Sequence, residues 1–262
     1  VEELQKPDVD IEKNRTFRKA GENFEQVDDL LMEAFEKQIW QDDLTKAPNM
    51  WERDDNVPQF VRSHVKEAID KTDVLYTKFD DIPHTAALKV HEIIKDQLTD
   101  PQGWSIETVT KELADEFEGL TKDEAEDIAR TEIAAVLNKA REIAYDAAKA
   151  ARAALDDRNI TGLPDTEGPD EVDVDAPEEE REVMYYWAGP EDHRTTNICS
   201  ETKDEIESRG GYVTKDELKE ILKAKARKYE DEDGGLPNRV EAFVPHFNCR
   251  HTFIREDYQR VT

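Results

Sequence analysis

Two histidines and a cysteine occur within six residues near the C-terminus of this chain, as His246, Cys249 and His251. The only other cysteine, Cys199, lies far upstream. Imidazole nitrogens and thiolate sulfurs are the ligands that Zn²⁺ takes in tetrahedral sites with four protein ligands. The residue types and their number therefore predict a zinc site made of Cys199, His246, Cys249 and His251, which would hold two distant segments together.

The same residues allow two other interpretations, and the sequence leaves them open. A disulfide between Cys199 and Cys249 would constrain the unfolded chain, but it needs an oxidising setting. A packed interior corner with two buried thiols and two hydrogen-bonded histidines is the other alternative. The spacing also differs from that of a standard zinc finger, because the upstream segment supplies a single ligand, for which His193 is a substitute.

An enzymatic hypothesis starts from His246, Asn248 and His251, which loosely resemble the histidine–asparagine–histidine arrangement of a metal-dependent nuclease. Such an enzyme needs a general-base histidine beside a metal-bound phosphate. Here the spacing is too short, and no Asp-His pair precedes the asparagine in the matching frame. We therefore expect no catalytic residues and no enzyme, and keep a DNA-acting metalloenzyme as the alternative function.

The charge of the chain sets the conditions under which these residues can be held together. The 262 residues include 64 acidic and 36 basic side chains, for a net charge of −28. Self-repulsion of this size destabilises a compact fold, and molar salt removes it because the Debye length falls to about 3 Å near 1 M. We interpret the excess as a halophilic surface; an ordinary protein with a disordered acidic tail is the alternative. The charge argues against broad nucleic-acid binding, and no apolar run is long enough for a membrane span.

Apolar residues at three- and four-residue spacing predict a helical body in the first two thirds of the chain. Helices are expected after an extended N-terminal arm over residues 1–20, in the ranges 22–40, 59–72, 84–98 and 105–119. Met50 and Trp51 should anchor the loop before the second of these. Thr121 and Glu124 form a capping box that begins the longest helix, which should end near Leu155.

The pattern changes after an acidic loop with prolines and glycines at residues 158–182. The next expected element is an aromatic strand over residues 183–188. Two helices should follow, begun by capping boxes at Thr202 and Thr214. Two short strands, 240–244 and 252–254, should then flank the cluster. The second helix carries a basic outer face, which suits a solvated surface, DNA or an acidic partner.

These elements predict an α+β fold that is predominantly α: a helical N-terminal body with one long helix, then a small C-terminal α+β unit clasped by the Cys/His cluster. The segments are an arm and helical region (1–104), a helical core with the long helix (105–157), an acidic linker (158–182) and a C-terminal α+β module (183–262).

Four motifs occur in a fixed order along this chain: Asp127-Ile-Ala-Arg-Thr-Glu132, an aromatic strand ending in Trp187, Asp192-x-Arg-Thr-Thr-x-Ile-Cys199 and Pro245-His-x-Asn-Cys-Arg250. In this order they resemble the head morphogenesis family of phage minor head proteins, typified by the Mu F protein and the SPP1 minor capsid protein. The resemblance covers about residues 105–254. Phe247 replaces the usual proline and His251 the usual last cysteine, and this exchange of one ligand for another favours a metal over a disulfide.

The resemblance implies a structural virion protein bound to the portal protein at one vertex of the head, acting in head assembly and in genome packaging and delivery. Contacts with the major capsid protein and with packaged DNA fit this place, and a membrane does not. Together with the acidic composition, it implies a tailed virus of a halophilic archaeon, assembled in the host cytoplasm. A host regulator with a zinc module is a further option.

The family's motif residues other than the four candidate ligands are expected to have structural roles: Arg130, Thr131, Glu132, Asp192, Arg194, Thr195, Asn248 and Arg250. Of these, Arg130 and Thr131 should lie toward the polar side of the long helix. An ion pair within the fold and a contact with the portal are both open there.

Overall fold

The computed structural model describes residues 39, 41–42, 46, 50–71, 84–158 and 182–258. Within these ranges the protein is predominantly helical, with one small antiparallel sheet of two strands and a Cys/His cluster near the C-terminus. This confirms the predicted fold class. The predicted arm, most of the first predicted helix and all but the ends of the acidic loop lie outside the described residues. Among the helices described, none carries an apolar stretch that could cross a bilayer.

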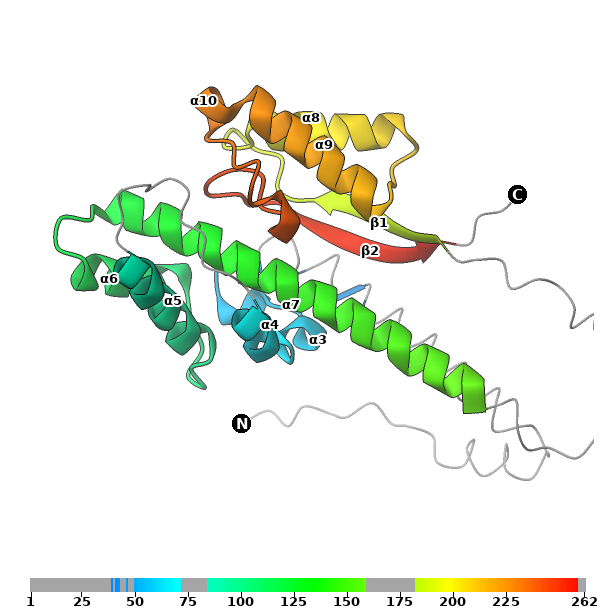
Figure 1. Cartoon of the computed structure of the whole chain (residues 1–262), viewed down its shortest axis with the longest axis horizontal. Helices are drawn as coiled ribbons and strands as arrows, with labels where there is room; N and C mark the ends of the chain where they lie inside the picture. Colours follow the sequence, from blue (N-terminus) through cyan, green and yellow to red (C-terminus); the bar gives the residue numbers. More distant parts are fainter. Residues whose placement is uncertain are drawn as a thin grey trace, which may run out of the picture.

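Short helices form a body on one side of the molecule (Figure 1): η2 (Asp54–Asn56), α3 (Gln59–Arg62), α4 (Val65–Lys71), α5 (His84–Leu98) and α6 (Ile106–Glu116). The helix predicted over 59–72 is thus two helices, because the chain tightens where His64 N–H bonds to the Val61 carbonyl three residues back. Met50 and Trp51 are fully buried, as expected of loop anchors. Ser105 caps α6, as predicted.

The longest helix, α7 (Lys122–Arg158), runs between this body and the C-terminal unit (Figure 1). Its capping box is confirmed, since Glu124 N–H bonds to Thr121 Oγ1 and Thr121 N–H to the Glu124 carboxylate. The helix buries two faces. Residues such as Ile133 and Leu137 pack against the helical body, whereas Ala134 and Ala135 pack into the core of the C-terminal unit. The core on the side of the helical body contains residues from both of the predicted segments 1–104 and 105–157. The limits of these segments remain a prediction.

The C-terminal unit layers helices over a two-stranded sheet. Strands β1 (Glu182–Ala188) and β2 (Thr252–Tyr258) pair antiparallel, with Trp187 opposite Phe253. Helices α8 (Asn197–Ser208) and α9 (Lys215–Lys228) contact β1, and α7 contacts β2, so the sheet lies between them (Figure 1). A short α10 (Glu230–Asp233) and η3 (Val240–Ala242) lead into the segment that carries the cluster.

Two local predictions in this unit are wrong. Thr202 does not cap a helix: it lies inside α8 and its hydroxyl donates to the Ile198 carbonyl, while Thr196 is the N-cap. Residues 240–244 are a 3-10 turn rather than a strand, because Phe243 adopts a left-handed backbone conformation that a strand excludes. The capping box of Thr214 and the strand after residue 251 are confirmed.

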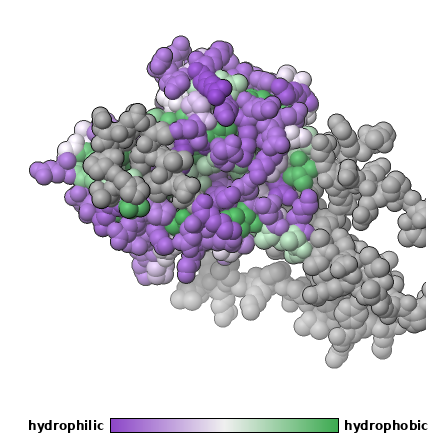
Figure 2. Space-filling model, viewed as in Figure 1, coloured by the Kyte–Doolittle hydropathy of each residue, from purple (hydrophilic) through white to green (hydrophobic). Residues whose placement is uncertain are grey.

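The surface in Figure 2 is predominantly hydrophilic, in keeping with the charge of the chain. On the basic face of α9, three lysines are paired with acids of neighbouring elements. Lys219 bonds to Glu241, and both Lys225 and Lys228 contact Glu201. These ion pairs engage part of the basic face for which the sequence allowed a contact with DNA.

Candidate metal centre

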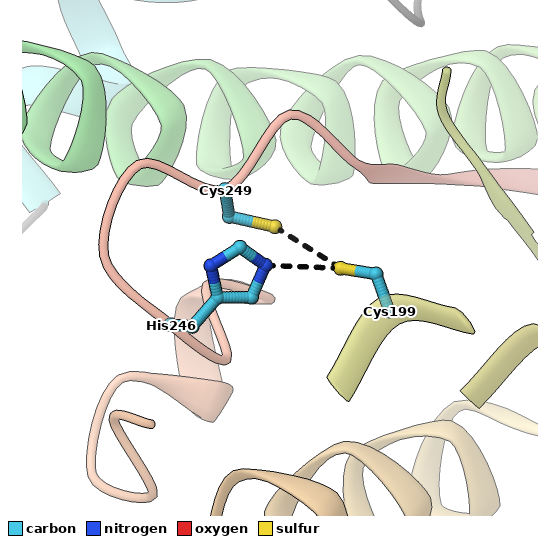
Figure 3. Close-up of side chains that lie close together, drawn as sticks. All are labelled: Cys199, His246 and Cys249. Carbon is cyan, nitrogen blue, oxygen red and sulfur yellow. Dashed lines mark hydrogen bonds between the residues drawn. The ribbon is translucent and has the colours of Figure 1, made fainter. Parts of the chain in front are cut away.

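Three of the predicted ligands meet in the interior of the C-terminal unit. Cys199 Sγ lies 3.0 Å from His246 Nε2 and 3.7 Å from Cys249 Sγ, and the three atoms lie within 4.8 Å of one another. Figure 3 shows Cys199 reaching in from α8, and His246 and Cys249 from the segment before β2. All three side chains are buried. This group could hold a metal ion.

The start of α8 positions Cys199. Thr196 is the N-cap, and its hydroxyl accepts the Cys199 N–H, so the sulfur belongs to the first helical turn. The Ile198 N–H is also satisfied from outside the helix, by the Asp233 carboxylate. Helix N-termini favour negative charge, which suits a thiolate at this position.

A glycine turn after α10 positions His246. Gly235 pairs with His246 in an antiparallel bridge, and the Phe247 N–H bonds to the Gly234 carbonyl. A side chain at Gly235 would place its Cβ 1.9 Å from the Ala226 carbonyl oxygen, so only glycine lets this turn lie against α9. His246 Nδ1 lies 2.7 Å from the Phe247 carbonyl, which only accepts. In the neutral ring Nδ1 therefore carries the proton, and Nε2 keeps its lone pair for a ligand.

Asn248 turns the chain between His246 and Cys249. Its backbone is left-handed (φ 60°), a conformation that asparagine tolerates better than most residues. Two bonds fasten it to α7: its N–H donates to Thr131 Oγ1, and its side-chain amide donates to Asp127 at 2.8 Å. The motif on α7 and the motif around Cys249 are thus in direct contact.

The Arg130, Thr131 and Glu132 side chains are all buried, so the expectation that the first two face the polar side is wrong. The C-terminal unit covers a second face of α7, which a single apolar stripe does not reveal. Arg130 bonds to Glu52 at 2.6 Å and to Glu126 at 2.9 Å. Of the two roles expected for this arginine, the ion pair within the fold is therefore observed.

Glu132 pairs with Arg239, and both side chains are buried. Burial raises the pKa of Glu132, and the guanidinium of Arg239 opposes that rise. The pair joins α7 to the residue before η3, and removing one member would leave the other charge buried and unpaired.

Asp192 and Arg250 form a second clamp, in which Nη1 and Nη2 of the guanidinium each donate to one carboxylate oxygen. Hydrogen bonds from Arg250 and from the Arg194 backbone hold the pKa of Asp192 well below its usual range. Thr195 completes the turn, since its hydroxyl accepts the Asp192 N–H and donates to the Pro190 carbonyl. The Arg194 side chain itself is exposed. The clamp ties the segment that leads into α8, which carries Cys199, to the segment before β2, which carries His246 and Cys249.

The two thiols and the imidazole influence one another's pKa. Burial raises the pKa of the Cys199 thiol, and Cys249 adds to the rise. Burial opposes ionisation of Cys249 as well, but a hydrogen bond from Cys199 and the charge of His246 lower its pKa. Burial opposes protonation of His246, yet the charge of Cys249 raises its pKa. The two directions favour the thiolate on Cys249 and the proton on Cys199. A cation that binds here would replace that proton.

His251 lies outside the group of three, which corrects the predicted set of four. The chain enters β2 directly after it, and its imidazole lies parallel to the Trp187 indole, 15° between planes and 6.0 Å between centroids. Burial lowers the pKa of His251 to about 4. His193, the predicted substitute, is exposed and is not in the group either. The alternative disulfide is not formed: both thiols are free, 3.7 Å apart.

Sequence reasoning missed several residues that build this centre. Gly235 carried a signal, because it belongs to a glycine pair in a turn. Asn138 carried no sequence signal that distinguishes it from an exposed helical asparagine. It is buried, donates to the carbonyls of Ala242 and Phe243, and accepts from the Thr252 hydroxyl, so it fastens α7 to both sides of the cluster segment.

Comparisons with protein-family models, with curated proteins and with solved structures find no match for this chain.

Proposed function

We propose that this protein is a structural minor head protein of a tailed virus, bound to the portal protein at one vertex and acting in head assembly and genome packaging and delivery. One observation supports this most: the separate motifs that carry the resemblance contact one another. Asp127 and Thr131 meet Asn248, Asp192 meets Arg250, and Trp187 lies against His251. Chance similarities scattered along a sequence have no reason to meet in space.

A zinc ion held by Cys199, His246 and Cys249 is part of the proposal. Two sulfurs that bind one zinc ion at about 2.3 Å in a tetrahedron lie about 3.8 Å apart, close to the 3.7 Å found between the two cysteines. When bound, zinc would supply a strong link between α8 and the cluster segment, because the unfolded chain lacks the site. His246 has Nδ1 against a carbonyl, the arrangement that prepares Nε2 as a ligand.

Burial of the centre favours a structural role over catalysis on DNA. A general base must come within hydrogen-bond reach of its substrate. His246 and His251 are each less than 5% exposed, and Asn248 is engaged with α7. In the role we propose, the helical body before α7 docks on the portal, and the C-terminal unit is a compact clip or plug near the DNA channel.

Mass spectrometry and metal analysis of the same purified particles test this proposal. We expect the protein in virions, in few copies relative to the major capsid protein, with about one zinc ion per chain. Absence from virions would contradict the structural role. Absence of zinc together with an intact Cys199–Cys249 bridge would contradict the metal centre alone. DNA cleavage by the purified protein that is lost in His246→Ala would establish the nuclease alternative instead.

A further inference from the structure

The cluster segment, residues 243–252, is fastened to α7 at both of its ends. Asn138 of α7 is fully buried, and its side chain donates to the Phe243 carbonyl and accepts from the Thr252 hydroxyl. Two of the three candidate ligands lie between these ends, where the segment passes beside α7 (Figure 3). A helix that supplies no ligand to the group of three thus holds the segment that supplies two.

Two further bonds hold the middle of this segment, at the residue before Cys249. Asn248 Nδ2 donates to Asp127 Oδ1 at 2.8 Å, and the Asn248 N–H donates to Thr131 Oγ1 at 3.3 Å. Thr131 and Asn138 follow Asp127 by four and eleven residues. At 3.6 residues per turn, the three positions lie within about 40° of one another around the helix. One face of α7 therefore carries a polar stripe, made of Asp127, Thr131 and Asn138, that matches the segment along its length.

The candidate ligand that depends most on this stripe is Cys249. Cys199 is placed by its own helix, because the Thr196 hydroxyl caps α8 there. His246 is placed by its bridge to Gly235, which lies against α9. Cys249 directly follows Asn248, whose left-handed backbone is fixed on α7 by the bonds to Asp127 and Thr131.

We infer that Asp127 and Thr131 are positioning residues of the proposed metal centre: through Asn248 they hold Cys249 toward Cys199 and His246 before a metal binds. A ligand that is already in place loses less conformational freedom on binding, so these contacts raise the affinity. Loss of contacts outside the ligand set typically costs 10- to 100-fold in metal affinity. The inference rests on the metal centre of the proposed function and adds α7 to the elements that set its affinity.

Titration of the full chain with Co²⁺ in molar salt tests the role of Asp127. Co²⁺ is the probe, because its thiolate charge-transfer absorption reports on the sulfurs that bind it. Asp127→Ala removes the acceptor of the Asn248 amide and keeps a strong helix former at this position. We expect the affinity to fall about 10-fold, while the absorption at saturation keeps its wild-type intensity because both thiolates remain. Asp127→Asn keeps an acceptor oxygen and should restore the affinity to within about threefold of the wild type.

Asp146→Ala is the matched control on the same helix. Asp146 also joins α7 to the C-terminal unit, through a bond of 2.7 Å to Arg255, but Arg255 lies in β2 after the cluster segment has ended. This variant should keep the Co²⁺ affinity within about twofold of the wild type. An equal loss in Asp127→Ala and Asp146→Ala would show that the affinity follows the whole interface rather than the placement of Cys249, and would overturn the inference.

Thr131→Val is the second variant and serves if Asp127→Ala does not fold. Valine keeps the shape of the side chain and removes the oxygen that accepts the Asn248 N–H. We expect a loss of affinity of about 10-fold here as well. Wild-type affinity in Asp127→Ala, or in Thr131→Val where it takes that place, would overturn the inference while leaving the metal centre intact.

Failure of the wild-type protein to bind Co²⁺ or Zn²⁺ would overturn the metal centre and the inference together. The presence of the protein in virions would still be decided by the particle analysis.

Discussion

Asn248 shows at the scale of one residue why the motif around the cysteine needs an asparagine. The chain must reverse between His246 and Cys249 for both side chains to face Cys199, and it does so with φ at 60°. The side chain then reaches Asp127 on α7 at 2.8 Å. Asparagine thus both tolerates the left-handed backbone and supplies the amide that bonds to α7.

Asn248→Gly and Asn248→Ala separate these two requirements. Glycine removes the bond to Asp127 and keeps the left-handed backbone, which should lower the free energy of unfolding by about 1 kcal/mol. Alanine also strains the backbone, which should cost about 1 kcal/mol more. Urea denaturation in molar salt, followed by circular dichroism, measures both. Equal losses in the two variants would show that the backbone conformation contributes nothing.

At the scale of elements, α7 is the feature around which the fold is arranged. It contributes Ile133 and Leu137 to one core and Ala134 and Ala135 to the other, so the two cores share a helix. Polar contacts then set the register of the C-terminal unit on this helix. Asn138 makes three of them from a fully buried position, to residues on either side of the cluster.

Asn138→Leu should therefore be among the more damaging changes in α7. It keeps helix propensity but leaves two carbonyls and the Thr252 hydroxyl without this partner, and the loss should be about 3 kcal/mol of unfolding free energy. Lys149→Leu, at an exposed position of the same helix, is the control and should change stability by no more than about 0.5 kcal/mol. Urea midpoints compared at equal slopes give both values. A similar small effect of Asn138→Leu would mean that the unit is held on α7 by apolar packing alone.

For the whole molecule, charge decides under which conditions the fold persists. The net charge of −28 sets many like charges on a mostly hydrophilic surface (Figure 2), and ion pairs such as those of Lys225 and Lys228 offset only some of them. Screening acts on the charges that remain unpaired, and it acts most strongly as the Debye length falls from about 10 Å at 0.1 M to about 3 Å at 1 M salt.

We expect the Tm to rise steeply between 0.1 M and 1 M KCl and more slowly above that range, because most of the repulsion is screened by then. Thermal unfolding followed by circular dichroism measures it. Sucrose is the control, since it stabilises compact states without screening charge. A Tm that is flat in KCl, or that rises only as much as in sucrose, would contradict the interpretation of a halophilic surface.

The sequence by itself determined most of the helices. Periodic apolar residues placed α5 and α7, and local capping pairs such as Thr121 with Glu124 marked where helices begin, because both signals depend on neighbours a few residues apart. It also supplied the side chains that could bind a metal. The fold class followed from the change of pattern near residue 183.

Only the tertiary structure decided which of these side chains meet. Four candidate ligands were equivalent in the sequence, and three converge because a left-handed Asn248 and the Gly235 bridge aim His246 and Cys249 at the start of α8. His251 is excluded because it stacks on Trp187 where β2 begins. Likewise, Thr131 and Glu132 are buried because Asn248 and Arg239 of the C-terminal unit contact them on a second face of α7. Periodicity along one helix reports only that an apolar face exists and not how many surfaces will cover the helix.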